Sequence, residues 1–576
     1  MFIPPGEKII ETRKCRISGE DFVITEKDAD MYEKIAPVFA GKKCSIPFPT
    51  LCPNERQMRR MMWRNYDHFY KNTCFLTWKE VITNYKSWTP YRVVTLDTWW
   101  WDSWNPFEYS KKVDFSRSFF EQFHELDQIT IHLPLSVVNS ENSDFTNFSI
   151  NNHNCYLCAR IAECEDCYYS FLITRCRHCV DCANLTDSEY LYECIRTTKS
   201  YRCFSCVDCE NCQDSYLLQD CTGCQDCFGS CNLRNARFVF NNQQLAESVY
   251  REKLSQTLNT VWDFWSLREK FSNYCSRFPK KYMSGYGNEG CFGNYLFSNS
   301  GVIYGFECYE SQNVRYAYWS HNVTDAIDMT FGYMHQKSLE IAGWTGGYNQ
   351  LFSVNNLTDC RDLLYSKDCA LGTTDSFGCV SLKKGKHCIL NTPYSHQEYE
   401  TTVLKLIDHM RSTGEWWEFF PWDYSPFTYN ESSAQVHFPL TKEKVHERDC
   451  QWYEAPIEQK KSDFVPLPID QYDEKIVWYA LAKEHIDQLL SETFVCIQSG
   501  KSYRILRQEL AFYIENHLPI PRLHPSIRSE ARLRQTLPIE LYARLCDECW
   551  QAFHTSYAPG RPEKILCEEC YRKLVY

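Results

Sequence analysis

The chain has no hydrophobic run long enough to cross a membrane. No apolar stretch approaches the roughly 18 residues that a transmembrane helix needs. The first ten residues, MFIPPGEKII, also lack the apolar core of a secretory signal. These absences lead us to expect a cytoplasmic protein that does not associate with membranes.

An excess of positive charge is absent as well. The 576 residues include 62 basic and 74 acidic side chains, so the formal net charge is −12. This balance argues against a general nucleic-acid coat or a polybasic membrane binder, but it leaves room for a local basic face. The length indicates several domains, each with its own core.

Common catalytic motifs are missing too. The sequence contains no GxSxG, no GxxxxGK[ST], no HExxH and no Rossmann glycine fingerprint after a strand. A non-enzymatic protein is therefore favoured. An enzyme with its site in a solenoid groove stays as an alternative, because such enzymes scatter their catalytic residues along the sequence.

Cysteine, by contrast, is abundant, with 33 residues in the chain. A disulfide scaffold is normally short and secreted. The odd cysteine count on a long chain without an export signal favours reduced thiols or metal ligands.

Most of the cysteines in the first half follow a period of three. The fifteen cysteines from Cys155 to Cys227 are all separated by multiples of three, and small apolar or hydroxyl side chains fill the rest of this register. A helix has a period of 3.6 and a flat strand a period of 2. The period of three therefore predicts a β-solenoid with one buried stripe and Asp-Cys and Asn-Cys pairs at its corners. Four cysteines recur at a constant offset of 18, which predicts the length of one coil: Cys158, Cys176, Cys194 and Cys212.

A later segment keeps this register with other side chains. From Cys308 the same step meets Val314, Ala317, Val323 and Ala326, which cannot bind metal as cysteine does. We therefore interpret the register cysteines as small core residues. A thiolate array, in a metal-storage or redox protein, is the alternative.

Two internal duplications organise the chain. The segments 226–250 and 375–399 match at an offset of 149, and each leads into a helical pattern, the second with a predicted stop at Gly414. The segments 47–74 and 519–546 match at an offset of 472, and 15–34 matches 496–515 at an offset of 481. Tryptophan clusters at 99–104 and 416–422 are expected to pack between domains.

The matches predict a mainly β protein with helices. We expect two β-solenoid segments, each followed by a helix, flanked by small zinc-ribbon-like α+β modules. The predicted divisions are an N-terminal degenerate zinc-ribbon-like module (1–110), a connector (111–144), a first cysteine-rich solenoid (145–241), a helical segment (242–285), a second solenoid (286–391), a helix (392–414), an aromatic and acidic connector (415–490) and a C-terminal zinc-ribbon module (491–576).

One group of cysteines has the spacing of zinc ligands. Cys546 and Cys549 form one CxxC pair, and Cys567 and Cys570 form a second after a 17-residue excursion. Two such pairs supply the four thiolates of a tetrahedral structural site, so we expect about one structural zinc ion per chain.

The equivalent positions elsewhere have lost ligands. They are Cys74, Thr77, Thr95 and Thr98 in one copy; Cys15, Ser18, Cys52 and Glu55 in another; and Cys496, Ser499, His524 and Ile527 in a third. No zinc is expected at these places, although Cys44 could complete the second set.

Arginines recur on one helical face in both end modules. Arg56, Arg60 and Arg64 are four residues apart, with Arg59 beside them, and the second copy keeps Arg528 and Arg532. Such a face could bind the phosphates or bases of RNA or DNA. The competing interpretation is a solvated face that forms salt bridges.

Several segments together resemble an uncharacterised bacterial family with zinc-ribbon ends around a cysteine-repeat middle. They include FPTLCPNERQMRRMMWRN, YAPGRPEKILCEECY, DCFGSCNLRN and GEWWEFFPWDYSPFTYN. The family's motif at 51–56 tends to be LCPxCR, whereas Glu55 replaces the second cysteine here. The resemblance implies this layout and no activity.

The function expected from these features is that of a zinc-containing scaffold. The rigid solenoid body and the ribbon-like ends would make macromolecular contacts, with a protein partner as the leading expectation. RNA or DNA binding through the arginine helices is the alternative.

Overall fold

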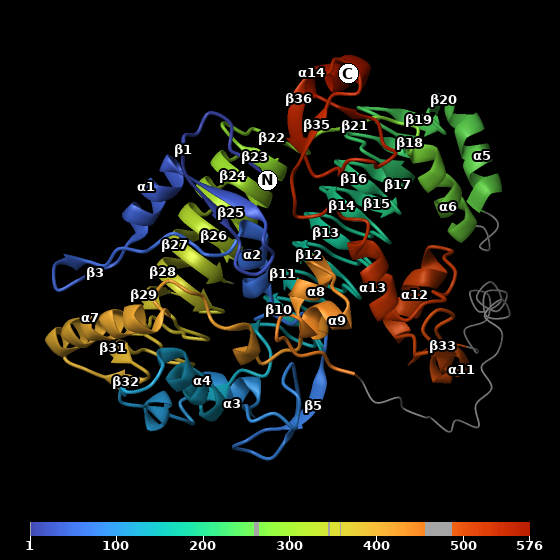
Figure 1. The fold of residues 1–576 in the computed structure, drawn as a ribbon. Helices are drawn as coiled ribbons and strands as arrows, with labels where there is room; N and C mark the ends of the chain where they lie inside the picture. The colour runs from blue at the N-terminus through green and yellow to red at the C-terminus, as the bar shows by residue number, and fades with distance from the viewer. Residues whose placement is uncertain (1, 259–263, 344–345, 358, 455–485, 576) are drawn as a thin grey trace.

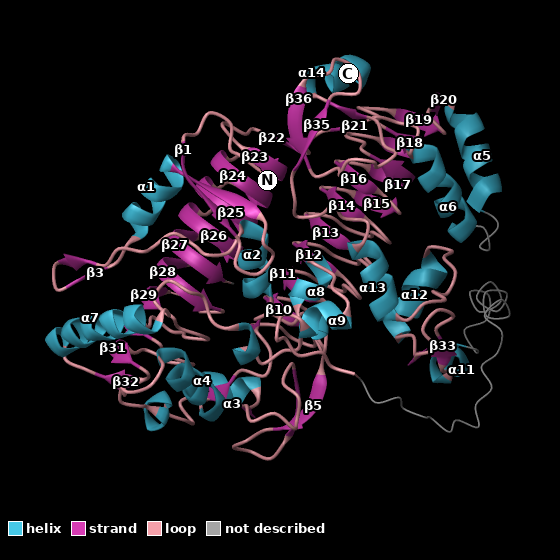
Figure 2. Ribbon diagram, in the orientation of Figure 1, coloured by secondary structure: helices cyan, strands magenta, loops and turns pink. Residues whose placement is uncertain are grey.

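The computed structural model describes residues 2–258, 264–343, 346–357, 359–454 and 486–575. Two stacks of short strands form its body, and helices lie at their ends and flanks (Figure 1; Figure 2). Both stacks are parallel except for a short antiparallel strand that ends each of them. The predicted fold class, mainly β with two solenoid segments, is confirmed. Among the described helices, none is both long and apolar enough to span a membrane.

The first solenoid runs from β9 to β20. Its strands are β9 (Val137–Val138), β10 (Asn147–Ile150), β11 (Ala159–Ala162), β12 (Phe171–Thr174), β13 (Ala183–Thr186), β14 (Ile195–Thr198), β15 (Tyr201–Phe204), β16 (Val207–Glu210), β17 (Gln213–Gln219), β18 (Gln225–Cys231), β19 (Arg237–Phe240) and β20 (Gln243–Gln244).

The coils of this solenoid are shorter than the cysteine spacing predicted. Ala159 pairs with Phe171, and Phe171 pairs with Ala183, so neighbouring coils are related by an offset of 12 and the predicted offset of 18 is wrong. Every third residue from Asn139 to Asn241 has a positive φ, which turns the chain at each corner of a coil. Asparagine and aspartate tolerate this conformation better than most residues, which explains the Asn-Cys and Asp-Cys pairs.

The residue after each corner points inward, and this position is the cysteine register. All fifteen register cysteines are buried. Many of their thiols donate to backbone carbonyls. Cys158 Sγ, for example, lies 3.4 Å from both Tyr156 O and Cys167 O. Burial raises the pKa of Cys158 and Cys164. The register thiols thus pack as small core residues.

The second solenoid repeats this design with a different core. Its strands are β22 (Gly285–Tyr286), β23 (Phe292–Phe297), β24 (Ser300–Tyr309), β25 (Gln312–His321), β26 (Thr324–Tyr333), β27 (His335–Ala342), β28 (Gly347–Val354), β29 (Cys360–Leu364), β30 (Thr374–Phe377), β31 (Lys386–Ile389) and β32 (Thr392–Pro393). Val314, Ala317, Val323 and Ala326 fill the interior where the first solenoid has cysteines.

Helices follow each solenoid. After the first come α5 (Glu247–Leu258) and α6 (Phe264–Cys275), and residues 259–263 of the expected helical pattern lie outside the described residues. After the second comes α7 (His396–Thr413), which begins with a capping box at Ser395 and ends at Gly414 with a φ of 75°. The predicted stop at Gly414 is therefore confirmed, because glycine adopts this left-handed conformation without strain.

The two end modules contain the same elements in the same order. The first has β1 (Ile9–Lys14), β2 (Asp21–Thr25), α1 (Glu26–Ile35), β3 (Val38–Phe39), β4 (Lys42–Lys43), α2 (Pro53–Met61), β5 (Tyr70–Thr73), β6 (Glu80–Thr83) and β7 (Arg92–Val93). The second has β33 (Phe494–Val495), β34 (Ser502–Tyr503), α12 (Arg507–Glu515), α13 (Pro525–Leu533), β35 (Tyr542–Leu545), β36 (Ala552–Thr555), β37 (Ile565–Leu566) and α14 (Glu568–Val575). The β3–β4 hairpin is the main addition in the first module.

Shorter elements join these parts. They are α3 (Leu96–Trp100), η1 (Pro106–Tyr109), α4 (Phe119–Ile129), β8 (Ile131–His132), β21 (Lys280–Lys281), η3 (Trp422–Tyr424), η4 (Tyr429–Glu431), α8 (Ser433–His437), α9 (Lys442–His446) and α11 (Ile486–Ser491). Residues 455–485 of the predicted connector lie outside the described residues.

The tryptophan-rich segments pack between parts of the chain, as expected for most of their side chains. Trp99 and Trp104 are buried in one cluster with Leu357 and Ala370 of the second solenoid. Trp416 is fully buried against the same solenoid, 6.3 Å from the ring of Tyr365. These contacts tie the first end module and the connector to the second solenoid.

The end modules cross over in the structure. The helices α1 and α2 of the first module pack on strands β26 and β27 of the second solenoid. The helices α12 and α13 lie beside the first solenoid (Figure 1), where Leu510 and Tyr513 share a core cluster with Tyr169 and Tyr192. Each solenoid is therefore covered by the end module from the opposite end of the chain.

Candidate metal centre and the arginine clusters

The four cysteines with zinc-ligand spacing come together in the structure. One sulfur from each of Cys546, Cys549, Cys567 and Cys570 lies within 4.8 Å of the other three. Among the described residues, these four cysteines are the one set of possible metal ligands that lie close enough together to share an ion. Four sulfur ligands complete a tetrahedron and leave no open position, as in a structural site.

Local backbone geometry holds this site. The β35–β36 hairpin carries Cys546 and Cys549 at its tip, and β37 with α14 carries the second pair. Burial raises the pKa of Cys546, but backbone amides of Cys567 and Cys549 that point at its sulfur outweigh burial and lower that pKa to about 6. A thiol that ionises this readily is a suitable metal ligand.

The ribbon containing these cysteines joins the two solenoids. Its strand β37 pairs with β21, which lies just before the second solenoid. Thr555 Oγ1 donates to Tyr282 O at 2.6 Å, and the Tyr571 hydroxyl donates to Asp220 of the first solenoid. A metal ion in this ribbon would therefore stabilise the junction between the solenoids.

The equivalent ribbon in the first module contains hydroxyl groups instead. Thr95 Oγ1 and Thr98 Oγ1 lie 2.7 Å apart and form a hydrogen bond. A hydrogen bond from Thr77 contributes to lowering the pKa of Cys74, although burial opposes it. Polar contacts among these four side chains replace the ligand set of the other ribbon.

At the two upstream sites the described residues gather no metal-ligand set, although Cys15 and Cys52 share a core cluster and Ser18 Oγ lies 3.8 Å from Cys52 Sγ. Glu55 Oε1 accepts a hydrogen bond from Arg448 at 2.7 Å, so this carboxylate is committed to an ion pair. His524 Nδ1 accepts from the amide of Ser526 at 3.1 Å, in a helix cap. Cys44 belongs to a different core cluster from Cys15 and Cys52.

The Thr77→Cys/Thr95→Cys/Thr98→Cys variant is expected to bind a second zinc ion, because it gives the first ribbon the ligand set of the second. Zinc content per chain should rise from about one to about two. Metal analysis after dialysis tests this, with Thr73→Cys/Thr89→Cys/Thr130→Cys as a control of equal cysteine count. An unchanged zinc content in the ligand-position variant would contradict the structural equivalence of the ribbons.

The arginine faces are not solvated, so this part of the prediction is wrong, whereas the predicted salt bridges are present. The six arginines Arg56, Arg59, Arg60, Arg64, Arg528 and Arg532 are all at most 5% exposed. Helix faces that are solvated or that bind nucleic acid need accessible guanidinium groups, and here the solenoids cover them. Arg56 and Arg60 are spaced along α2 and Arg528 and Arg532 along α13, as the sequence predicted, whereas Arg64 lies beyond the end of α2.

Arg56 and Arg60 form ion pairs with carboxylates of the second solenoid. Arg60 Nη1 lies 2.6 Å from Glu340, and Arg56 Nε lies 2.9 Å from Asp328. The nearby field of Asp328 outweighs burial and raises the pKa of Arg56. Arg59 pairs with Glu418 at 2.6 Å. Arg64 instead donates to Gly343 O and stacks 3.8 Å from the ring centre of Phe148.

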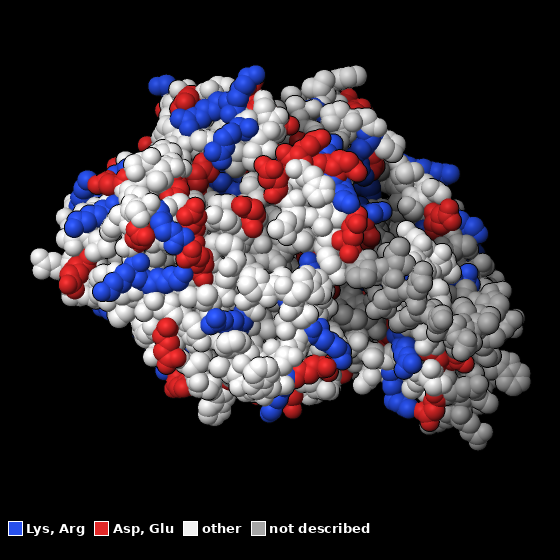
Figure 3. All heavy atoms as spheres, turned by 60° about the horizontal axis from the view of Figure 1, so that its bottom comes forward, with Lys and Arg blue, Asp and Glu red and all other residues white. Residues whose placement is uncertain are grey.

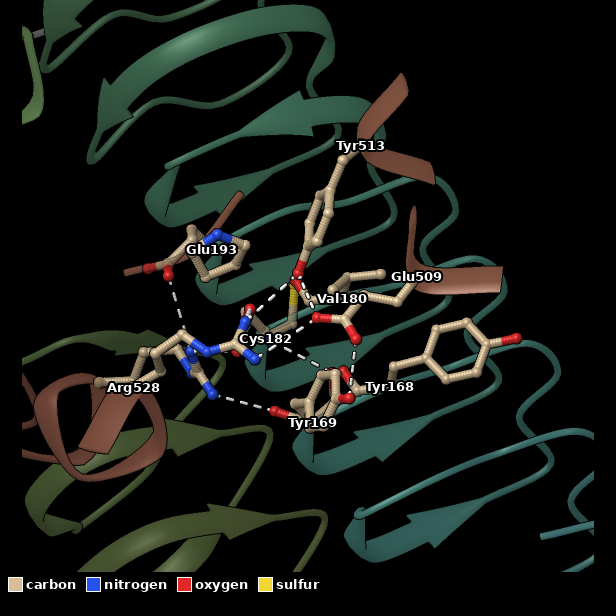
Figure 4. A network of polar contacts seen from close by, with 12 residues as sticks. Tyr168, Tyr169, Val180, Cys182, Glu193, Glu509, Tyr513 and Arg528 are labelled. Carbon is tan, nitrogen blue, oxygen red and sulfur yellow. Dashed lines mark hydrogen bonds and ion pairs between the residues drawn. The ribbon is translucent and has the colours of Figure 1, made fainter. Parts of the chain in front are cut away.

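The second module makes the same contacts with the first solenoid. Arg532 Nη1 lies 2.7 Å from Asp181 and 3.7 Å from Glu193. Arg528 also pairs with Asp181, and its guanidinium lies 4.8 Å from the ring centre of Tyr169. Figure 4 shows Arg528, Tyr169, Glu193, Glu509 and Tyr513 gathered between the red helices and the teal solenoid.

The two networks correspond residue by residue. Asp181 and Glu193 are one coil apart in the first solenoid, and Asp328 and Glu340, at an offset of 147, are one coil apart in the second. Arg56 stacks 5.2 Å from the ring centre of Tyr316, as Arg528 does on Tyr169. The chain thus has an internal two-fold pattern in which each half docks its arginines on the other.

Two exposed tryptophans at the ribbon tips are a further feature, which no sequence motif indicates. Trp78 and Trp550 stand at equivalent positions, four residues after Cys74 and Cys546, and are 82% and 74% exposed. Both have a positive φ, of 60° and 64°. At the equivalent position, four residues after Cys15 and Cys496, the other two hairpins have Gly19 and Gly500. An exposed tryptophan at both ribbon tips, in place of the glycine of the other two hairpins, distinguishes these tips.

Elsewhere the surface carries mixed charge. Figure 3 shows basic and acidic side chains interspersed over the face it presents. An open groove of about 640 Å³ on the first solenoid is lined by side chains of both signs, and Arg175 there pairs with Asp187 at 2.5 Å. The charged side chains of this groove largely form ion pairs with one another.

A small hollow lies between the solenoids. Its volume is about 20 Å³, and Phe171, Glu307, Tyr318 and His437 are among its lining residues. This space suits a water molecule and is far below the roughly 300–1,000 Å³ of typical small-molecule sites. Burial raises the pKa of Glu307 to about 7, against the favourable field of Arg196 and a hydrogen bond from Tyr309.

The Glu307→Gln variant is expected to stabilise the protein in a pH-dependent way. The unfolded chain ionises this carboxyl near pH 4.5 and the folded chain near pH 7, so the wild type loses stability as pH rises between these values. The gain from the variant should grow by about 2–3 kcal/mol between pH 5 and pH 8. Denaturant midpoints at both pH values measure this gain. Glu310→Gln, with a side chain that is 65% exposed, is the control and should show no such growth.

Comparison with known proteins adds no assignment. No protein-family model matches the chain, and no curated protein matches it.

Proposed function

We propose that the chain is a non-enzymatic, zinc-containing scaffold protein of the cytoplasm that binds protein partners through its ribbon tips. The observation that carries this proposal is the equivalent exposure of Trp78 and Trp550. Large exposed tryptophans are typical of interaction sites, since they bury much apolar area at little entropic cost.

The rest of the molecule supports this role by fixing the tips. Buried ion pairs hold α2 and α13 on the solenoids, and β37 pairs with β21 beside the metal centre. Two recognition tips on a rigid body lose little conformational freedom when they bind, which favours affinity. A structural zinc ion at Cys546, Cys549, Cys567 and Cys570 would order the second tip.

The nucleic-acid alternative finds less support. The arginines proposed for it are buried, and five of the six form ion pairs, so they offer no accessible positive face in this arrangement. For this reason we favour protein partners.

A comparison of three variants tests the proposal. The tagged wild type, Trp78→Ala/Trp550→Ala and Trp101→Ala are each used to capture proteins from nuclease-treated cells. Trp101 is a matched control, because it is 72% exposed but lies outside the ribbon tips that carry Trp78 and Trp550. We expect specific proteins that the wild type and Trp101→Ala retain and the double variant loses. An identical set with all three proteins would exclude the ribbon tips as the binding site.

A further inference from the structure

Two cysteines outside the three-residue register face each other at the end of the first solenoid. Cys231 is the last residue of β18, and Cys275 is the last residue of α6. Their sulfur atoms lie 2.9 Å apart, although 44 residues separate them in the chain. Both side chains are buried, at 0% and 4% exposure.

This contact differs from those of the register thiols. Cys227, the preceding register cysteine, donates to Gln225 O at 3.3 Å and to Ala236 O at 3.6 Å. The sulfur of Cys231 has the sulfur of Cys275 as its hydrogen-bonding partner. A separation of 2.9 Å is less than 1 Å longer than a disulfide bond of about 2.05 Å, so a small side-chain movement would join them.

We propose that Cys231 and Cys275 form a reversible disulfide when the protein meets hydrogen peroxide. One sulfur, as its thiolate, attacks a peroxide oxygen and becomes a sulfenic acid, and the departing hydroxide takes up the proton that the thiol had lost and leaves as water. The other thiol attacks this sulfur, and a second water leaves. Two thiols and one peroxide thus give one disulfide and two waters, and a dithiol reverses the reaction.

The position of the bond gives it a structural consequence. It fastens α6 to the last strands of the first solenoid, against which α6 already packs. Five residues after Cys275, Lys280 begins β21, the strand that pairs with the metal-binding ribbon. The disulfide would therefore fix the junction that places the ribbon between the solenoids.

Mass spectrometry of the full-length protein tests the proposal. Protein treated with hydrogen peroxide is alkylated, unfolded and digested without reduction. We expect a cross-linked peptide containing Cys231 and Cys275, two hydrogen atoms lighter than the sum of the separate peptides. Dithiothreitol should abolish it. The oxidised wild type should also melt a few degrees higher than the reduced protein.

Three variants separate this reaction from general oxidation. Cys231→Ser and Cys275→Ser should lose the cross-linked peptide and the melting shift. Cys227→Ser, a buried neighbour within the register, should keep both. Zinc content is measured in parallel, so that oxidation of the metal ligands is seen separately. The proposal is overturned if Cys231 and Cys275 both remain thiols while the exposed Cys549 is oxidised, or if Cys231 is cross-linked to a register cysteine.

Discussion

The Cys549→Ser variant is expected to lose the zinc ion and unfold the ribbon around it. Cys549 is the exposed member of the ligand set, so the substitution removes a ligand with little change in packing. Metal binding contributes about 10–16 kcal/mol in comparable small zinc modules, which is more than such a ribbon gains from its own core. Zinc per chain should fall from about one to near zero, and β37 should lose its pairing with β21.

Metal analysis after dialysis, with hydrogen exchange of residues 542–575, measures both effects. Cys291→Ser is the control, because Cys291 is also incompletely buried but lies outside the ribbon. It should retain its zinc. A Cys549→Ser protein that keeps one zinc ion would exclude this site, and many metal ions per wild-type chain would mean that the register cysteines bind metal.

The Arg60→Met and Arg532→Met variants are each expected to destabilise the protein by about 3–5 kcal/mol. The two side chains are at most 2% exposed, and each faces two buried carboxylates. Arg56 still pairs with Asp328 and Arg528 with Asp181, but removal of Arg60 or Arg532 leaves each group of buried carboxylates with one cation fewer, which is costlier than loss of a surface ion pair. Because the two sites correspond, the two effects should be similar in size.

Denaturant midpoints and limited proteolysis measure this loss. Arg534→Met is the matched control, since Arg534 lies two residues from Arg532 but its side chain is 73% exposed and pairs with Glu530 on the same helix. It should change stability by less than about 0.5 kcal/mol. Addition of Glu340→Gln to Arg60→Met should recover part of the loss. If Arg534→Met and Arg532→Met lowered the stability of the protein equally, burial would not explain the effect at Arg532.

The coil length shows how far a periodic sequence can be interpreted. The register reveals an inward position at every third residue, and this part of the prediction holds. An offset of 12 and an offset of 18 are both whole multiples of three, so cysteine spacing alone cannot distinguish them. Backbone pairing, such as Ala159 with Phe171, decides between them. The same offset of 12 is visible in the sequence as aromatic residues that stack between coils, such as Phe228 on Phe240.

The arginines show a second limit. Their spacing correctly predicted one face on each helix, but a helical face does not indicate what covers it. The covering residues are Asp328 and Glu340 for one module and Asp181 and Glu193 for the other, in distant parts of the chain. In contrast, the zinc ligands depend on local hairpin geometry, and the sequence identified all four that the structure brings together.

The crossed arrangement of the end modules has a consequence for synthesis. Solenoids usually fold by adding each coil to its neighbour, so their contacts are short in sequence. Here Arg56 can pair with Asp328 only after a further 272 residues have been synthesised. Asp181 can pair with Arg528 only after a further 347 residues. At about 5–20 residues per second, the first of these delays lasts roughly 15–55 s. During that time the module at 1–110 carries positive charges without their partners, so completion of the fold depends on a module that is synthesised after both solenoids.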